Sequence, residues 1–456
     1  MFPNPQDALP LPSKPNVERY KNLTKELVRA CKSGDSSAIH DWALKWVNSL
    51  VKLSGLVVTR HLPVAIDRWV NQLEEYARRQ MNPSVISGGA GAVPSYPCRV
   101  TDAQFVIARS HGFSGWPKFV KHLDGLAHKT SPTAAFEAAA DAIVSGDIVR
   151  LKELLEKNST LVRMRSMRDH RATLLHYVSA NGVEGYRQRT PKNAFKVAEL
   201  LLKTGAEVDA EADVYGGGAT TLGLVATSLH PHLAGVQIQL MQLLLDHGAQ
   251  LDSENSSGNK QTAVLACLAN GRFEAAVYLA EKGARLDLES AAGLGRLDIV
   301  RNYFDERGKL KRPATKKQLQ SAFLHACGWG RNSVVEFLLT KGVDVGIKSG
   351  DRQTALHWAA IGGQLDTMKL LLKYNPPLEA KNEYGGTVLG QTLWSAAHGG
   401  DPALYAGIIE TLIGAGAKVP ERHVPINKRI DRLLKRYGSV SEPRWHWYGE
   451  KPRARK

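Results

Sequence analysis

Residues Thr354–Gly363 read TALHWAAIGG and lead into MKLLLKY at Met368–Tyr374. Altered copies of this phrase occur at Thr173–Gly182 (TLLHYVSANG), Thr262–Gly271 (TAVLACLANG) and Ser321–Gly330 (SAFLHACGWG). Self-similarity of this kind predicts stacked supersecondary units, because each unit buries its apolar face only against its neighbours. Such a stack offers a long surface and no preformed chemical pocket. The pattern therefore favours binding over catalysis.

Glycine or asparagine residues mark where each second helix ends. Either residue type suits the left-handed conformation of a helix C-cap. These positions are Asn158, Gly205, Gly248, Gly283, Gly308, Gly342, Asn375 and Gly416. Some intervals between them are close to a repeat period of about 33 residues, others are longer and the one from Gly283 to Gly308 is shorter, which indicates insertions into an array with one shortened unit. The extra residues fall in the turn between the helices of a unit, at 183–195, 228–235 and 397–404.

The TALHWAAIGG phrase and its copies resemble the ankyrin-repeat family, over residues 133–420. The resemblance implies an all-α ankyrin-repeat solenoid with about seven to eight repeats, some of them irregular. In such a repeat a helix, a turn and an antiparallel helix are followed by a β-hairpin finger, and the first helices and fingers line a concave face. By the same resemblance, His176 and His357 are expected to hydrogen-bond neighbouring backbone, whereas Gly223 and Gly390 replace that histidine.

Other segments flank the repeats. Residues 1–16 are expected to be disordered, and residues 17–130 to form a small helical domain. Within it, DAQFVIARSHGFSGWPK at Asp102–Lys118 resembles a leader of bacterial ankyrin-repeat proteins, which implies a bacterial origin and no activity. Residues 421–438 are predicted to contain a helix that caps the last repeat. Residues 439–456 are expected to form a disordered basic tail.

The net charge of +16 is unevenly distributed. Residues 1–131 carry +7 and residues 418–456 carry +8, whereas residues 132–417 carry +1. Because the repeats are balanced, the high isoelectric point does not by itself indicate nucleic-acid binding.

The cysteines bear on the cellular compartment. Cys31, Cys98, Cys267 and Cys327 lie far apart, without a C-x-x-C motif. We interpret them as buried thiols of a reducing compartment and not as disulfides or zinc ligands. Since no stretch of about 18 apolar residues occurs, the sequence predicts a cytoplasmic protein without a membrane segment.

Side chains of the first helices are candidates for partner binding. Alignment on the repeated phrase directs several of them into the concave groove, and the tryptophans among them would form an aromatic stripe. Large aromatic residues on a rigid surface are frequent hot spots of protein interfaces. The alternative is that they pack between neighbouring first helices. The candidates are Tyr177, His325, Trp329, Trp358, Gln391 and Trp394.

The two adjacent insertions are a second candidate site. A carboxylate, a phenol and a guanidinium lie together in the first insertion and could perform acid–base chemistry. They could equally join the long turn to the second insertion. Two histidines there are too few ligands for a metal site, and no phosphate-binding, zinc-protease or nucleophile-elbow motif is present, so we predict no metal and no cofactor. The residues are Glu184, Tyr186, Arg187, Gln188, His230 and His232.

These features predict a non-catalytic protein–protein interaction module that binds its partner through the concave groove and the fingertips. The alternative is an enzyme or small-ligand binder with a site at the insertions 183–195 and 228–235. Nucleic acid is a third possible partner, through the basic tail, where aromatic and basic residues alternate in a way that suits single strands.

Overall fold

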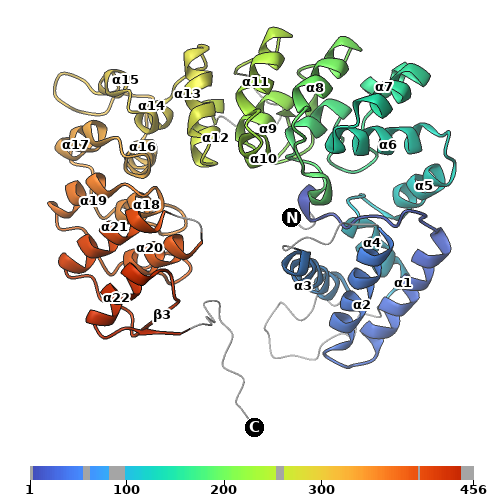
Figure 1. Ribbon diagram of the computed structural model, residues 1–456, viewed down its shortest axis with the longest axis horizontal. Helices are drawn as coiled ribbons and strands as arrows, with labels where there is room; N and C mark the ends of the chain where they lie inside the picture. The colour runs from blue at the N-terminus through green and yellow to red at the C-terminus, as the bar shows by residue number, and fades with distance from the viewer. Residues whose placement is uncertain (1–3, 55–61, 82–97, 253–260, 399–400, 443–456) are drawn as a thin grey trace. The chain divides into compact units, whose positions relative to one another are not determined.

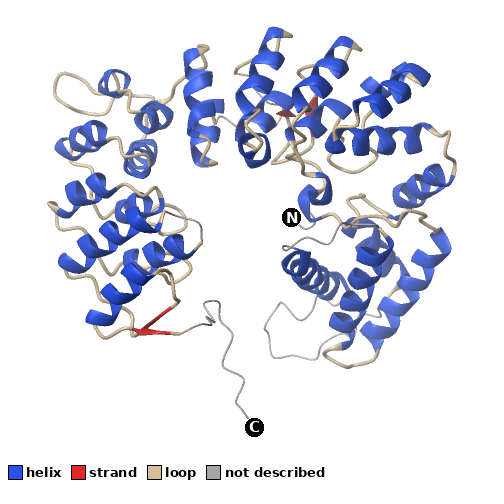
Figure 2. Cartoon of the chain, in the orientation of Figure 1, coloured by secondary structure: helices blue, strands red, loops and turns tan. Residues whose placement is uncertain are grey.

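The structure is a computed structural model that describes residues 4–54, 62–81, 98–252, 261–398 and 401–442 (Figures 1 and 2). The described chain is predominantly helical with two short strand pairings, which confirms the predicted all-α class. None of the described helices has the length and apolarity needed to cross a bilayer.

The described residues form two compact units. Unit 1 runs to Ala263 and includes Asn270–Tyr278, and unit 2 comprises Val264–Ala269 and the residues from Leu279 onward. The boundary therefore passes through α12 (Ala263–Ala269) and α13 (Phe273–Glu281).

Five helices open unit 1 and enclose a core of their own. Asn16 is the N-cap of the first helix: its side chain accepts a hydrogen bond from the Glu18 backbone N–H at 2.8 Å. Tyr20 is fully buried in this core, with its ring edge-on to Trp46 and Phe119 at 5.4 and 4.8 Å. The helices are α1 (Val17–Lys32), α2 (Ala38–Leu53), α3 (Leu62–Met81), α4 (Val100–Ser110) and α5 (Trp116–Ala127).

The segment before α1 is packed against these helices. Pro5–Asp7 forms a short 3-10 helix (η1), and Leu9 is buried. The Leu9 N–H donates to the Ser110 carbonyl at 2.8 Å, and the Leu9 carbonyl lies 3.0 Å from Nδ1 of His111. The expectation of disorder is therefore wrong for the described part of this terminus. Ala8 and Leu9 are buried, and two apolar residues are too few to show a periodicity that sequence analysis could detect.

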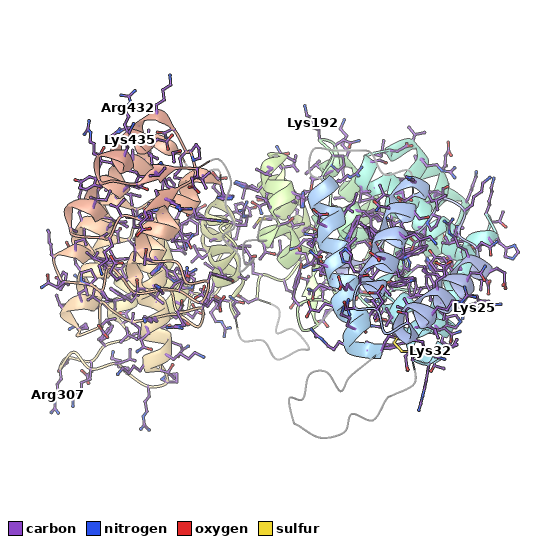
Figure 3. All side chains as sticks on the ribbon, turned by 90° about the horizontal axis from the view of Figure 1, so that it is seen from below. Lys25, Lys32, Lys192, Arg307, Arg432 and Lys435 are labelled. Atoms are coloured by element: carbon purple, nitrogen blue, oxygen red, sulfur yellow. A yellow bond between two sulfur atoms is a disulfide. The ribbon has the colours of Figure 1, made fainter. Side chains whose placement is uncertain are left out.

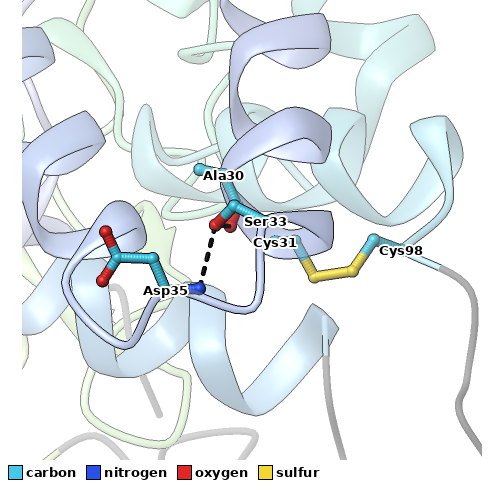
Figure 4. The surroundings of a disulfide bond; sticks show 5 residues. All are labelled: Ala30, Cys31, Ser33, Asp35 and Cys98. Atoms are coloured by element: carbon cyan, nitrogen blue, oxygen red, sulfur yellow. Dashed lines mark hydrogen bonds between the residues drawn. A yellow bond between two sulfur atoms is a disulfide. The ribbon is translucent and has the colours of Figure 1, made fainter.

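Cys31, in the last turn of α1, and Cys98, two residues before α4, form a disulfide (Figure 4). Beside it, Ser33 closes the turn after α1: its hydroxyl donates to the Ala30 carbonyl and accepts from the Asp35 N–H. The interpretation of all cysteines as free thiols is wrong for this pair, whose members are 67 positions apart. Cys267 and Cys327 are free and buried.

The remainder of unit 1 consists of paired helices, turns and a β-hairpin. The insertion at 183–195 contains a 3-10 turn, η5, and the insertion at 228–235 contains a short helix, α10. The strands are antiparallel, with Glu211 opposite Thr220. The elements are α6 (Pro132–Ser145), α7 (Ile148–Lys157), η3 (Ser159–Arg163), η4 (Leu174–Ser179), η5 (Gly185–Arg187), α8 (Ala194–Lys203), β1 (Glu211–Ala212), β2 (Ala219–Thr220), α9 (Thr221–Thr227), α10 (Leu229–Leu233) and α11 (Gln237–Asp246).

Unit 2 is a row of helix pairs. The first helices α14, α16, α18 and α20 pack on one another in chain order, and so do the second helices α15, α17, α19 and α21. One continuous apolar core runs between the two layers. The bounds are α14 (Leu288–Leu294), α15 (Leu297–Arg301), α16 (Lys316–Gly328), α17 (Asn332–Thr340), α18 (Ala355–Ile361), α19 (Leu365–Leu372), α20 (Val388–Ala397) and α21 (Pro402–Gly414).

Helix α22 (Lys428–Arg436) follows the last pair and packs on α21. It buries Ile430 and Leu434 completely and turns its basic residues outward. Parallel strands β3 (Arg422–His423) and β4 (Val440–Ser441) hold the two ends of this segment together.

Candidate functional site

A buried histidine links one repeat of unit 2 to the next. Nδ1 of His357 lies 3.2 Å from the Thr354 backbone N and 2.8 Å from its hydroxyl, while Nε2 lies 3.2 Å from the carbonyl of Gly386 in the following finger. The first pair of contacts closes the N-terminus of α18 as a capping box, and the last one crosses to the neighbouring repeat. His176 makes the equivalent contact with the Ala219 carbonyl in unit 1, so the expected backbone role of both histidines is confirmed.

Glycines allow the first helices of unit 2 to approach closely. A methyl group on Gly362 would lie 1.9 Å from the Gly328 carbonyl oxygen, so α16 and α18 are in backbone contact there. Trp358 covers Gly328 from α18, and a methyl group on Gly328 would come within 3.1 Å of its ring. Trp329 approaches Gly293 of α14 in a similar way. Both tryptophans are therefore half-buried and pack partly between neighbouring first helices, as the alternative interpretation expected.

Trp394 remains open to solvent. It lies on α20, is 41% exposed, and stacks its ring on His398 at 4.3 Å. Ile361, at the corresponding position of α18, is 44% exposed. The Tyr405 hydroxyl donates to the Ile361 carbonyl at 3.1 Å, and Leu404 lies against Gly363. We call Ile361, Trp394 and Leu404 the Trp394 patch, since these three exposed apolar residues lie on adjacent helices of unit 2.

The other predicted groove residues present less surface. Tyr177 and His325 are buried, so the prediction that they contact a partner is wrong. The Tyr177 hydroxyl donates to Glu184 at 3.4 Å, and the His325 ring is edge-on to Trp358 at 5.0 Å. Burial lowers the pKa of His325 to about 4, which keeps its ring neutral. Gln391 is half-buried and its amide carbonyl accepts from Asn382 at 3.3 Å.

The first insertion takes part in a buried ionic cluster in unit 1. Nη1 of Arg168, from the first finger, lies 2.7 Å from Glu137 on α6 and 2.8 Å from Glu184. Arg187 lies 2.7 Å from the other oxygen of Glu137 and 2.8 Å from Asp141. Four of these charged residues (Glu137, Arg168, Glu184 and Arg187) are buried. We call these four the ionic cluster.

The cluster corrects the prediction of a functional insertion surface. Glu184 and Arg187 are not on the surface, and their partners come from α6 and the first finger. Tyr186 accepts a hydrogen bond from Arg168 at 3.3 Å, and the Gln188 amide donates to the Val183 carbonyl at 2.9 Å. The four predicted side chains of the first insertion are therefore engaged within the fold. Sequence reasoning missed Glu137, although a lone glutamate in an alanine-rich helix (AAFEAAADA) was a usable signal.

Burial and ion pairing act in opposite directions on the cluster carboxylates. Burial alone would raise the pKa of Glu137, but the guanidinium groups of Arg168 and Arg187 outweigh it and hold that pKa at about 2. The same balance places the pKa of Glu184 well below its usual range. Burial lowers the pKa of the neighbouring His122 to about 4. At neutral pH the cluster therefore holds two carboxylates, two guanidinium groups and a neutral imidazole beside them, which is a poor arrangement for proton transfer.

The histidines of the second insertion stay apart from the cluster. His230 and His232 lie on α10 and are partly buried, and burial lowers the pKa of His230. Across the described residues no group of three or more histidine, cysteine or acidic side chains is arranged to hold a metal ion.

Comparison with known families identifies the repeats. A family model for ankyrin repeats, in three copies, matches residues 288–382 and 323–422, all within unit 2. The chain is therefore an ankyrin-repeat-containing protein, as the TALHWAAIGG phrase indicated.

Proposed function

We propose that unit 2 is a non-catalytic protein–protein interaction module whose contact surface is centred on the Trp394 patch. Ankyrin repeats generally mediate protein–protein interaction, and the repeats matched by the family model carry this patch. The observation that supports the proposal best is the exposure of Trp394, Ile361 and Leu404 on helices fixed by a continuous core. A rigid, exposed aromatic residue contributes binding free energy at little entropic cost.

The two partly buried tryptophans pack between the first helices that lead up to the patch. Trp358 and Trp329 fill the spaces next to Gly328 and Gly293, so they fix the spacing of the first helices. On this proposal a partner contacts mainly Trp394 and its neighbours, and Trp329, Trp358 and Gln391 form the partly buried border of the contact surface.

The experiment compares Trp394→Ala with Tyr374→Ala in affinity capture followed by mass spectrometry. Tyr374 is 45% exposed and follows the second helix α19, away from the first helices, so it is a matched aromatic control. Because Trp394 is exposed, we expect both variants to melt within about 2 °C of the natural protein. Loss of the same captured proteins with Trp394→Ala alone supports the proposal, and unchanged capture refutes it.

An enzymatic or ligand-binding site at the insertions is the second candidate. We do not favour it, because the side chains that would act are engaged in the ionic cluster. Nucleic-acid binding was predicted for the basic tail, residues 439–456. The expected disorder is wrong for residues 439–442, which contain strand β4, and residues 443–456 lie outside the described residues.

A further inference from the structure

Between residues 279 and 422 the excess positive charge of unit 2 lies in one hairpin, and a second excess follows in residues 423–456. Residues 301–317 contain seven lysines and arginines and two acidic residues, whereas residues 318–422 contain nine of each. We call the exposed cations of the connection between α15 and α16 and of the first turn of α16 the basic hairpin. They are Arg307, Lys309, Lys311, Arg312, Lys316 and Lys317.

The hairpin is ordered by its own hydrogen bonds. Phe304 and Leu310 form an antiparallel bridge, and the Asp305 N–H donates to the Lys309 carbonyl at 2.9 Å. The Asp305 carboxylate accepts from the Lys309 N–H at 2.7 Å, so one of the two acidic groups serves the turn. Figure 3 shows Arg307 projecting away from the ribbon. The cations are thus held outward on a fixed support.

Further cations lie at the base of the hairpin. The Lys341 ammonium is 5.7 and 5.2 Å from the ring centres of Phe304 and Phe337, and Arg301 is 5.7 Å from the latter. A methyl group on Gly308 would lie 3.0 Å from the Lys341 ammonium, so Lys341 touches the hairpin. Within the part of the chain that the structure describes, none of the six cations of the basic hairpin forms an ion pair.

Two of these unpaired cations are also placed unfavourably in their helix. Lys316 and Lys317 occupy the first turn of α16, where the helix dipole favours negative and not positive charge. The free protein therefore holds like charges close together, two of them at the unfavourable end of a helix. An anionic partner would relieve both effects.

We infer that the partner of unit 2 is a protein with a carboxylate-rich segment that docks on the basic hairpin. The inference rests on the proposed function and adds the partner's charge to it. A nucleic acid fits less well, because a duplex carries about one charge per 1.7 Å and demands a continuous basic surface. The next two fingers interrupt such a surface with Asp344, Asp351, Glu379 and Glu383.

The experiment is selection from a random peptide display library on the full chain in about 0.1 M salt, where charges are screened beyond about 10 Å. The test variant is Lys309→Glu, Lys311→Glu, Arg312→Glu. The control variant, Lys348→Glu, Lys373→Glu, Lys381→Glu, makes the same change of net charge at exposed positions of other repeats. A single-stranded oligonucleotide serves as competitor, and the recovered peptides are measured by fluorescence anisotropy.

We expect peptides rich in Asp and Glu, with affinity lowered about tenfold or more by the test variant and much less by the control. Enriched peptides without acidic bias, or acidic peptides held equally by the test variant, overturn the inference and leave the proposed function standing. Displacement of the peptides by an oligonucleotide that binds more tightly also overturns it, in favour of nucleic acid. No enrichment on the natural chain contradicts the proposed function itself, and the inference with it.

Discussion

Replacing Arg168 by Met should destabilise unit 1 more than any surface change. The Arg168 guanidinium contacts Glu137 at 2.7 Å and Glu184 at 2.8 Å, and its side chain is 1% exposed. Methionine preserves much of the stem but leaves Glu184 with only Arg187 at 3.5 Å and the His170 ring at 3.6 Å as basic neighbours among the described residues. A buried carboxylate is thereby left largely uncompensated.

The magnitude follows from the cost of breaking a buried ion pair. Removing one partner costs about 3–5 kcal/mol, and about 1 kcal/mol lowers the melting temperature of a domain of this size by about 2–4 °C. We therefore expect a decrease of about 6–20 °C for unit 1. Glu184→Gln keeps the shape and removes one charge, so it should cost less, about 1.5–3 kcal/mol. Arg163→Met, at an exposed position near the same finger, is the control and should change stability by about 0.5 kcal/mol or less.

The effect should depend on pH. In the natural protein the folded-state pKa of Glu137 is about 2, below its unfolded value, so its stabilising contribution is present above about pH 4.5 and is lost as the pH falls towards 2. Without Arg168 the folded-state pKa rises, and acid then neutralises the uncompensated carboxylate. The difference in unfolding free energy between natural protein and variant should therefore shrink from pH 7 to pH 3.

Differential scanning calorimetry and urea denaturation at several pH values make the measurement, with circular dichroism as a second probe because two units need not unfold together. A cost below about 1 kcal/mol at pH 7 would show that the charges are not paired as described. A cost that is the same at pH 7 and pH 3 would refute the electrostatic explanation.

Further perturbations test other parts of the fold. Gly362→Ala should destabilise unit 2 strongly, because its methyl group would meet the Gly328 carbonyl at 1.9 Å, whereas Gly414→Ala, where nothing lies within 4 Å, should be nearly neutral in the same urea titration. Burial lowers the folded-state pKa of His176 to about 4, so stability should be lost as the pH falls from about 6.5 towards 4, and His176→Gln should flatten part of that decline; an unchanged pH profile would contradict the neutral buried ring. Thiol titration of the denatured, unreduced chain should find Cys267 and Cys327 reactive and all four cysteines only after reduction, which would also lower the thermal stability of unit 1.

The sequence predicted those structural features that recur from repeat to repeat. The Thr354–His357 phrase fixes a capped first helix and a bond to the next finger, and both recur as described. Helices α1 to α5 lie within residues 17–130, where the sequence predicted a small helical domain. These properties are local, so a single chain shows them directly.

Long-range pairings were not predictable in the same way. Arg168 and Glu137 are 31 positions apart and Cys31 and Cys98 are 67 apart, and no local pattern joins such residues. The exposure of Trp394 beside the half-burial of Trp358 was also hidden, because it depends on what the neighbouring helix places beside each ring, as Gly328 does for Trp358. Position in the repeat gave the direction of these side chains, and the neighbouring helix decided how much of each remains accessible.

The contact between η1 and η5 links the start of the chain to the ionic cluster. A methyl group on Gly185 would lie 2.3 Å from the Gln6 carbonyl oxygen, so the two backbones are in contact. Ala8 and the stem of Arg168 both lie next to Gly112. The first residues therefore act as a seal over four buried charges. Removing or displacing them would let water reach those charges. The free energy of the ionic cluster therefore depends on whether the N-terminal residues stay in place.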